Sequence, residues 1–446
     1  MTPPPEDDAA GAIAALVKAH AGAGLPVRLR MWDGSEAGPQ NRPVLVVRSP
    51  RALRRILWRP GELGLARAYV SGDLDLDGDL TEALRLVRQA LSPDGTTRPA
   101  RANGARTVRT LAARARTVRA LATRARTVRT LATRAPAARA ALRAAVALKV
   151  LAPPWRPPPP PDCELKVHGR LHSRARDKAV VAGHYDLPAA FYRLILDPTM
   201  AYSCAHWTGA DTLAEAQQNK LDLIARKLDL RPGRRLLDLG CGWGSLTVHA
   251  ASAHRAAVTA VTLSREQGGY VRRRLSGLGL ADRAEVLIQD YRDASGGPYD
   301  AIASIEMGEH VGAAGYPAFC AALHRLLRPG GRLLIQQMSR GPAAPGGGKF
   351  IESYIAPDMH MRPVGETVRL IEDAGFEVIG VEAMREHYAR TIRAWLANFE
   401  QNQPAVATIL TEEQVRVWRL YLAGSALAFE DGRMGVDQIL AVRPAP

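Results

Sequence analysis

The chain has 446 residues, 47% of them hydrophobic, and a formal net charge of +16. This length allows two or three domains that each bury a core, and the apolar fraction fits a folded soluble protein and excludes a disordered chain. No run of about 18 uncharged apolar residues predicts a membrane span. The four cysteines have neither paired nor metal-binding spacing, which excludes a disulfide framework and indicates a reducing compartment.

The positive charge is concentrated in one segment. Residues 101–150 contain twelve arginines, one lysine and no acidic residue, so they carry +13 and the rest of the chain only +3. The first eight residues are acidic and proline-rich, which is not the pattern of a secretory signal. A basic, cytoplasmic protein is therefore expected, with its basicity confined to one region.

Residues 10–95 are expected to form a small mixed α/β accessory domain. Strand-like runs at 27–31 and 43–47 precede a helix-like stretch at 52–58, and glycine and aspartate mark the turns between them.

Residues 96–161 are expected to form a linker of two kinds. The first part repeats alanine, arginine and leucine with a period of ten residues, which favours helix, and the second part is a proline-rich spacer. The arginine repeat has three interpretations: a solvated linker, a patch for anionic membrane lipid, or a segment that binds nucleic-acid phosphates. Because it lacks interleaved aromatic residues and any known nucleic-acid-binding fold, no nucleic acid is expected as a partner.

Residues 162–446 alternate apolar strands with helical patterns. Such alternation predicts parallel strands joined by crossover helices in a doubly wound α/β sheet. The strands are expected at 235–239, 257–263, 284–288, 299–304 and 332–337, and the helices at 245–253, 265–279 and 316–327. Two later segments, 376–382 and 436–442, are expected to complete the sheet at its edge.

A glycine-rich turn follows the first of these strands. Gly240, Gly242 and Gly244 allow the backbone to approach a ligand closely, with a helix N-terminus behind the turn. A dinucleotide fingerprint would have its third glycine one residue later and an acidic residue after the next strand, and both are missing here. The segment Asp238–Gly242 resembles instead the first motif of class I S-adenosylmethionine (SAM)-dependent methyltransferases, a Rossmann-like fold.

Four further blocks occur in order along the same region: His184–Asp186, Leu196–Trp207, Gln289–Asp293 and Glu309–Gly312. Together they resemble the cyclopropane-fatty-acyl-phospholipid synthase family, over about the last 60% of the chain. Members of that family transfer the SAM methyl group to a cis double bond of an acyl chain, usually in a phospholipid.

The resemblance implies which residues bind SAM. They are Tyr202, Ser203, Asp238, Gly240, Cys241, Gly242, Gly244, Thr262, Gln267, Asp290 and Tyr291. Of these, Asp290 is expected to accept a hydrogen bond from the adenine amine, and Tyr291 to stack on the ring.

The resemblance also implies a catalytic group beside the substrate. The family holds a bicarbonate ion there, and its matching positions are Cys204, Glu309 and Tyr388, with Gln336 where the family has a histidine. Methyl transfer to an alkene leaves a carbocation that must be stabilised and must then lose a proton. Bicarbonate, oriented by Glu309 and Tyr388, is expected to take that proton.

The product stays open between a cyclopropane and an exocyclic methylene, which a flavin-dependent reductase partner would reduce to a methyl branch. Gln336 is the position expected to influence this choice. Two other functions are considered: a methyltransferase for a small molecule, and a non-catalytic basic protein that binds membrane or nucleic acid.

The expected location is the inner face of the cell membrane, as a peripheral cytoplasmic enzyme held to anionic lipid by the arginine-rich segment. No metal site is expected, because His249 and His254 lack further ligands at metal-binding spacing in the sequence.

Overall fold

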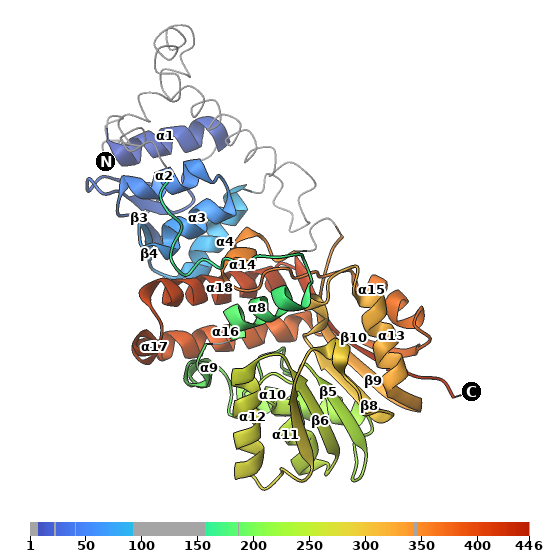
Figure 1. Cartoon of the computed structure of the whole chain (residues 1–446). Coiled ribbons are helices and arrows are strands. Elements are labelled where there is room, and N and C mark those ends of the chain that lie inside the picture. Colours follow the sequence, from blue (N-terminus) through green and yellow to red (C-terminus); the bar gives the residue numbers. More distant parts are fainter. Residues whose placement is uncertain are drawn as a thin grey trace. The chain divides into compact units, whose positions relative to one another are not determined.

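The computed structural model describes residues 8–21, 24–40, 42–91, 157–185, 187–342 and 346–445 (Figure 1). The predicted arginine repeat, and the linker as far as residue 156, lie outside the described residues. The chain divides into two compact units, residues 1–164 with 412–420, and residues 165–411 with 421–446. The predicted domain boundaries at 10–95, 96–161 and 162–446 stay predictions.

The first unit contains a four-stranded sheet in the order β2-β1-β3-β4. Its core is apolar, with Leu29, Val47, Ala52 and Leu74 among its buried residues. Ser49 caps the N-terminus of α2, accepting a hydrogen bond from the Arg51 backbone. Its elements are α1 (Ala9–Ala21), β1 (Arg28–Arg30), β2 (Glu36–Ala37), β3 (Val44–Val47), α2 (Pro50–Trp58), α3 (Glu62–Val70), β4 (Leu74–Asp77) and α4 (Leu80–Leu91).

The second unit is built on a seven-stranded sheet in the order β10-β11-β9-β8-β5-β6-β7. Its strands are β5 (Arg235–Leu239), β6 (Ala257–Thr262), β7 (Ala284–Ile288), β8 (Tyr299–Ile305), β9 (Leu327–Arg340), β10 (Glu377–Ala383) and β11 (Met434–Val442). Only β11 runs opposite to its neighbours. The prediction that 376–382 and 436–442 complete the sheet at its edge is confirmed, with β10 outermost and β11 between β10 and β9.

Helices cover both faces of this sheet (Figure 1). Leu236 joins one apolar core with α10, α11 and α12, whereas Leu237 joins a second core with α13 and α15. Successive residues of a strand point to opposite faces, so a strand buried on both faces is apolar throughout. These helices are α10 (Leu213–Lys227), α11 (Ser245–Ala253), α12 (Arg265–Gly277), α13 (Tyr316–Leu326) and α15 (Val364–Glu372).

The remaining helices are α8 (Arg174–Tyr185), α9 (Ala189–Ile195), η1 (Tyr291–Asp293), η2 (Gly308–His310), α14 (Lys349–Tyr354), α16 (Arg385–Gln401), α17 (Gln403–Ile409) and α18 (Glu412–Glu430). Among the described residues, no helix is both long and apolar enough to cross a membrane. Since β5, β6, β7 and β8 are parallel, their carboxyl ends meet at one edge of the sheet, where such folds bind ligands.

Candidate active site

A cavity at this edge of the sheet has an open volume of about 1300 Å³. Its wall includes nine of the residues predicted to bind SAM, from four separate stretches of the chain. They are Tyr202, Ser203, Asp238, Gly240, Cys241, Gly242, Thr262, Gln267 and Tyr291. The remaining two predicted residues, Gly244 and Asp290, do not line the cavity.

The three glycines after β5 all have positive φ, at +85°, +54° and +79°. A Cβ atom on Gly240 would lie 2.8 Å from Met307 Cγ, and one on Gly244 would lie 2.8 Å from both Cγ atoms of Val271. A Cβ atom on Gly242 would meet nothing within 4 Å. Gly240 and Gly244 are therefore required by packing, while Gly242 leaves the space that a ligand needs to reach the backbone.

Asp238, the last polar residue of β5, is buried in the cavity wall. Thr247 Oγ1, on α11, donates a hydrogen bond of 2.6 Å to its carboxylate. Burial raises the pKa of Asp238 to about 6. The carboxylate is thus fixed in place, two residues before the glycine turn begins at Gly240.

Neutral polar groups stand at the end of β6, where a dinucleotide-binding fold would have a carboxylate. Thr262 Oγ1 donates to Gln267 Oε1 at 2.9 Å, and both side chains are buried in the cavity wall. Ser264 caps α12 by accepting a hydrogen bond from the Gln267 backbone. This hydrogen bond to Ser264 fixes the backbone of Gln267, so that its side chain lies beside Thr262.

Asp290 is positioned by its neighbour. Arg292 donates from Nε to Asp290 Oδ1 at 2.7 Å and from Nη2 to Oδ2 at 2.6 Å. Arg292 and Tyr291 line the cavity, whereas Asp290 does not. Both oxygens expected to meet the adenine amine are thus paired with a guanidinium, and the role of Asp290 stays a prediction.

A carboxylate that the sequence analysis missed lies at the end of β8. Glu306 has a left-handed backbone, with φ of +52°, and lines the cavity. Its Oε1 accepts from the Cys204 backbone N–H at 2.8 Å and from Gln336 Nε2 at 2.9 Å. Its Oε2 accepts from the Tyr388 hydroxyl at 2.5 Å. The sequence signal for Glu306 was its place directly after a parallel strand, at the edge where sites form.

The predicted catalytic residue Glu309 has a different environment. It is 1% exposed and does not line the cavity. Its Oε1 accepts from the Met338 backbone N–H at 2.5 Å, and its Oε2 has no hydrogen-bond partner among the described residues. Burial, and then the charge of Glu306, raise the pKa of Glu309 to about 8. Its environment therefore favours the neutral form of Glu309.

The groups expected to hold bicarbonate are thus already engaged. Cys204, Gln336 and Tyr388 all donate to Glu306, and Gln336 Oε1 accepts from Gln438 Nε2 at 2.9 Å. This arrangement does not fit a bicarbonate ion, because the carboxylate of Glu306 takes up its donors. The Cys204 thiol is buried, which raises its pKa, so it is not a thiolate.

Lys220, from α10, was also missed. It is 1% exposed, lines the cavity, and donates from Nζ to Ser203 Oγ at 2.8 Å. Burial lowers its pKa, and the charges of Glu306 and Asp197 oppose that shift. Its sequence signal is a lysine on the apolar face of a helix, with Leu221 and Ile224.

Comparisons with known proteins agree on one family. The family described as mycolic acid cyclopropane synthetase matches residues 172–439. A probable fatty acid methyltransferase of Pseudomonas putida is 34% identical over 432 residues, which cover 94% of this chain and 92% of that protein. The cyclopropane-fatty-acyl-phospholipid synthase of Escherichia coli K12 is 36% identical over 273 residues, which cover 61% of this chain and 70% of that protein.

A solved structure matches the fold. The crystal structure of the mycolic acid cyclopropane synthase CmaA1, complexed with SAH and CTAB, is 33% identical and has a TM-score of 0.57. The match covers 59% of this chain and 98% of that one.

Proposed function

Because this chain belongs to the mycolic acid cyclopropane synthetase family, we propose that it methylates the cis double bond of acyl chains carried by phospholipids. Membership makes the chain a SAM-dependent methyltransferase that acts on unsaturated fatty acyl chains, which excludes the non-catalytic alternative. The predicted Rossmann-like class I fold and the predicted methyl donor SAM are confirmed.

The cavity offers a surface for a hydrocarbon chain as well as for SAM. Its wall includes the apolar side chains of Val180, Met200, Leu221 and Ile224. A mostly apolar cavity with a few fixed polar groups is the usual site for a ligand of this kind. The name of the relative from Escherichia coli supports a phospholipid as the carrier of the chain.

In the first step, an alkene carbon takes the methyl group from the SAM sulfonium, the carbon–sulfur bond breaks, and the neighbouring carbon becomes a cation. Close positioning in the cavity supplies much of the rate for so weak a nucleophile. The Tyr202 ring, packed 5.2 Å from the ring of Trp395 in the second unit, and the Glu306 carboxylate are the groups that stabilise the cation.

In the second step, Glu306 accepts the proton that the cation must lose. The observation that carries this assignment is the set of three hydrogen bonds to its carboxylate, from Cys204 N, Gln336 Nε2 and Tyr388 Oη. Burial raises the pKa of Glu306, and these donors favour its ionised form. Among the described residues, the Glu309 carboxyl accepts a single hydrogen bond, from the Met338 backbone, and its raised pKa favours the neutral form.

We assign the product as an exocyclic methylene. A hydride shift from the methylated carbon moves the cation onto that carbon, and loss of a proton from the new methyl group to Glu306 then gives the double bond. A relative that matches nearly the whole chain is named as a probable fatty acid methyltransferase, which supports this outcome over ring closure. A flavin-dependent reductase would be the partner that converts the methylene to a methyl branch.

The decisive experiment incubates the full-length protein with dioleoylphosphatidylglycerol vesicles and methyl-labelled SAM. Label is expected in the acyl chains of intact phospholipid, with free oleate as the comparison substrate. Because cyclopropane and methylene products have the same mass, proton NMR must distinguish them by their vinylidene or ring-methylene signals. Ring signals alone would reject the methylene assignment, and label only in free oleate or another small molecule would reject the phospholipid.

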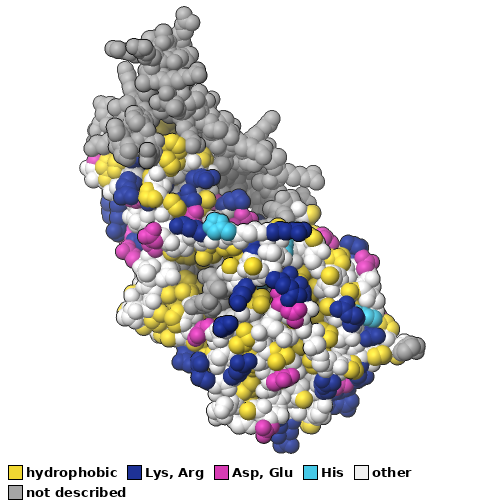
Figure 2. All heavy atoms as spheres, in the orientation of Figure 1, with side chains coloured by type: hydrophobic (Ala, Val, Ile, Leu, Met, Phe, Trp, Pro, Cys, Tyr) yellow, Lys and Arg dark blue, Asp and Glu magenta, His cyan; other side chains and the backbone are white. Residues whose placement is uncertain are grey.

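Peripheral binding to the cytoplasmic face of the membrane is proposed for the arginine-rich segment, since each basic residue near anionic lipid contributes about 1 kcal/mol. On the face drawn in Figure 2, the basic side chains of the described residues are interspersed with acidic ones. Deletion of residues 101–143 is expected to weaken binding to anionic liposomes and to leave SAM affinity intact. Unchanged liposome binding would reject this role.

A further inference from the structure

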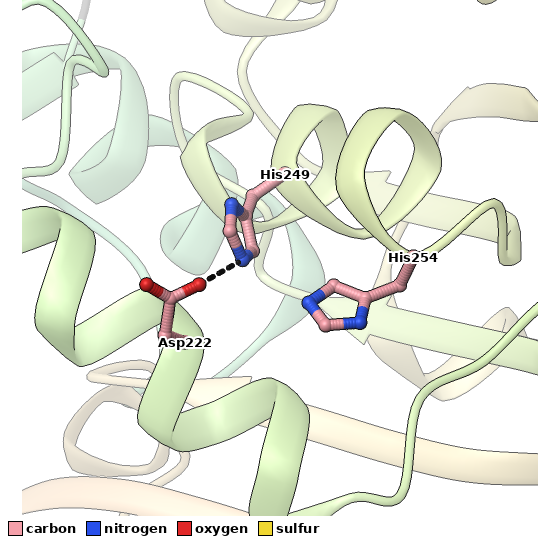
Figure 3. A group of neighbouring side chains, drawn as sticks. All are labelled: Asp222, His249 and His254. Atoms are coloured by element: carbon pink, nitrogen blue, oxygen red, sulfur yellow. Dashed lines mark ion pairs between the residues drawn. The ribbon is translucent and has the colours of Figure 1, made fainter.

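Asp222, His249 and His254 lie close together (Figure 3), and none of the three lines the cavity. Asp222 comes from α10, His249 from α11, and His254 is the C-terminal cap of α11. One ligand atom from each side chain lies within 4.8 Å of the other two. The sequence shows no further ligand for these histidines, because Asp222 approaches them only through the packing of α10 on α11.

The His249 ring is buried, and its Nε2 atom faces the carboxylate of Asp222. It is 8% exposed, and its Nε2 atom is buried and makes no regular hydrogen bond within the described residues. This atom lies 3.1 Å from Asp222 Oδ1. The centroid of the His254 ring lies 5.2 Å from that of His249, and a ring nitrogen of His254 points toward the same space in Figure 3.

We propose that these three side chains bind Zn²⁺. Two imidazoles and one carboxylate are a ligand set that zinc favours, with a water molecule as the fourth ligand. Tetrahedral zinc places its ligand atoms about 3.3 Å apart, so the cluster must contract by rotation of side chains. Asp222, whose side chain is 40% exposed, and the partly exposed His254 have the freedom to do so, and they leave a solvent route for the ion.

Gln218 supplies an outer contact to the same cluster. Its Nε2 lies 3.4 Å from His249 Nδ1 and 3.3 Å from both carboxylate oxygens of Asp222. A histidine that binds zinc through Nε2 carries its proton on Nδ1 and donates it to an acceptor. The exposed Gln218 amide can turn to present Oε1 to that proton.

The role of this zinc is structural. Both helices also contribute residues to the cavity wall, through Leu221 and Ile224 of α10 and through Ser245 and Leu246 of α11. An ion held by both helices stabilises the folded unit, because a ligand that binds only the native state raises the melting temperature. It does not take part in methyl transfer, since none of its three ligands lines the cavity.

The experiment titrates the full-length protein, stripped of metal by a chelator, with Zn²⁺ by calorimetry and with Co²⁺ by visible absorption. Wild type is expected to bind one ion per chain, to show the intense absorption of tetrahedral cobalt, and to melt at a higher temperature with zinc. Asp222→Asn and His254→Ala are expected to weaken binding at least tenfold. His168→Ala, which removes an exposed histidine outside the cluster, is the matched control and is expected to bind as wild type does.

SAM affinity, measured in parallel, shows whether each variant is folded. The absence of saturable zinc binding to the wild type would overturn the proposal without reference to any variant. Equal affinities in wild type, Asp222→Asn and His254→Ala would overturn it as well, since the ion would then be bound elsewhere.

Discussion

The glycine turn after β5 (Gly240–Gly244) and the acidic turn after β8 (Glu306–Glu309) lie at the same edge of one sheet, and they have different roles. The first turn has glycine at each position of positive φ, where Gly240 and Gly244 allow close packing and Gly242 leaves room for a ligand. The second turn has Glu306 at a positive φ, where glycine would be less strained. Of these two turns, only the second has a side chain at a position of positive φ, as a group that takes part in proton transfer must be a side chain.

A second contrast exists within the acidic turn itself. Glu306 and Glu309 lie three residues apart, yet one accepts three hydrogen bonds at the cavity wall and the other is buried with a single donor. Two carboxyl groups whose environments separate their pKa values take different roles in catalysis. In the mechanism proposed above, Glu306 is the base, and Glu309 is a buried carboxyl group with a raised pKa.

The largest expected effect comes from removing the base. Glu306→Gln is expected to lower kcat by about 10² to 10⁴, the usual contribution of a general base, and to change SAM affinity by less than about twofold. Glu309→Gln keeps a neutral group of the same shape and is the matched control, with an expected loss below about tenfold. Single-turnover methylation and calorimetric SAM titration measure both quantities. A larger fall in kcat for Glu309→Gln than for Glu306→Gln would show that Glu309 is the base.

Tyr388→Phe tests how the base is held. The variant loses one hydrogen bond to Glu306 that favours the ionised form, so the pKa of Glu306 rises further. Because the ionised base is the active form, the acidic limb of the pH–rate profile is expected to move to higher pH. The maximal rate is expected to fall about tenfold, which corresponds to about 1.4 kcal/mol. An unshifted acidic limb would show that Tyr388 does not act through Glu306.

Gly244→Ala tests the glycine turn. Alanine is disfavoured at φ of +79°, and its Cβ would lie 2.8 Å from both methyl carbons of Val271. We expect the free energy of unfolding to fall by about 1–3 kcal/mol, measured by urea denaturation. Gly277→Ala is the control, because Gly277 lies in α12 with nothing within 4 Å of a Cβ, and it is expected to stabilise by about 0.4–1 kcal/mol. Equal stability of the two variants would show that packing against Val271 does not require glycine at position 244.

The sequence by itself determined the strands β5 and β7 and the helix α11 at their observed bounds, and it identified the cofactor turn. These features are local, because an apolar run, a glycine turn and a helix cap are read within about ten residues. The four segments that resemble the cyclopropane-fatty-acyl-phospholipid synthase family also predicted the methyl donor and the class of substrate.

Tertiary structure alone decided which carboxylate faces the cavity and which histidines lie beside Asp222. Glu306 was missed because its role depends on Cys204, Gln336 and Tyr388, which come from distant parts of the chain. Asp222 meets His249 only where α10 packs on α11. The pKa of a side chain depends on its burial and on neighbours that are distant in the sequence. Neither can be predicted from a local pattern such as the one that identified the glycine turn.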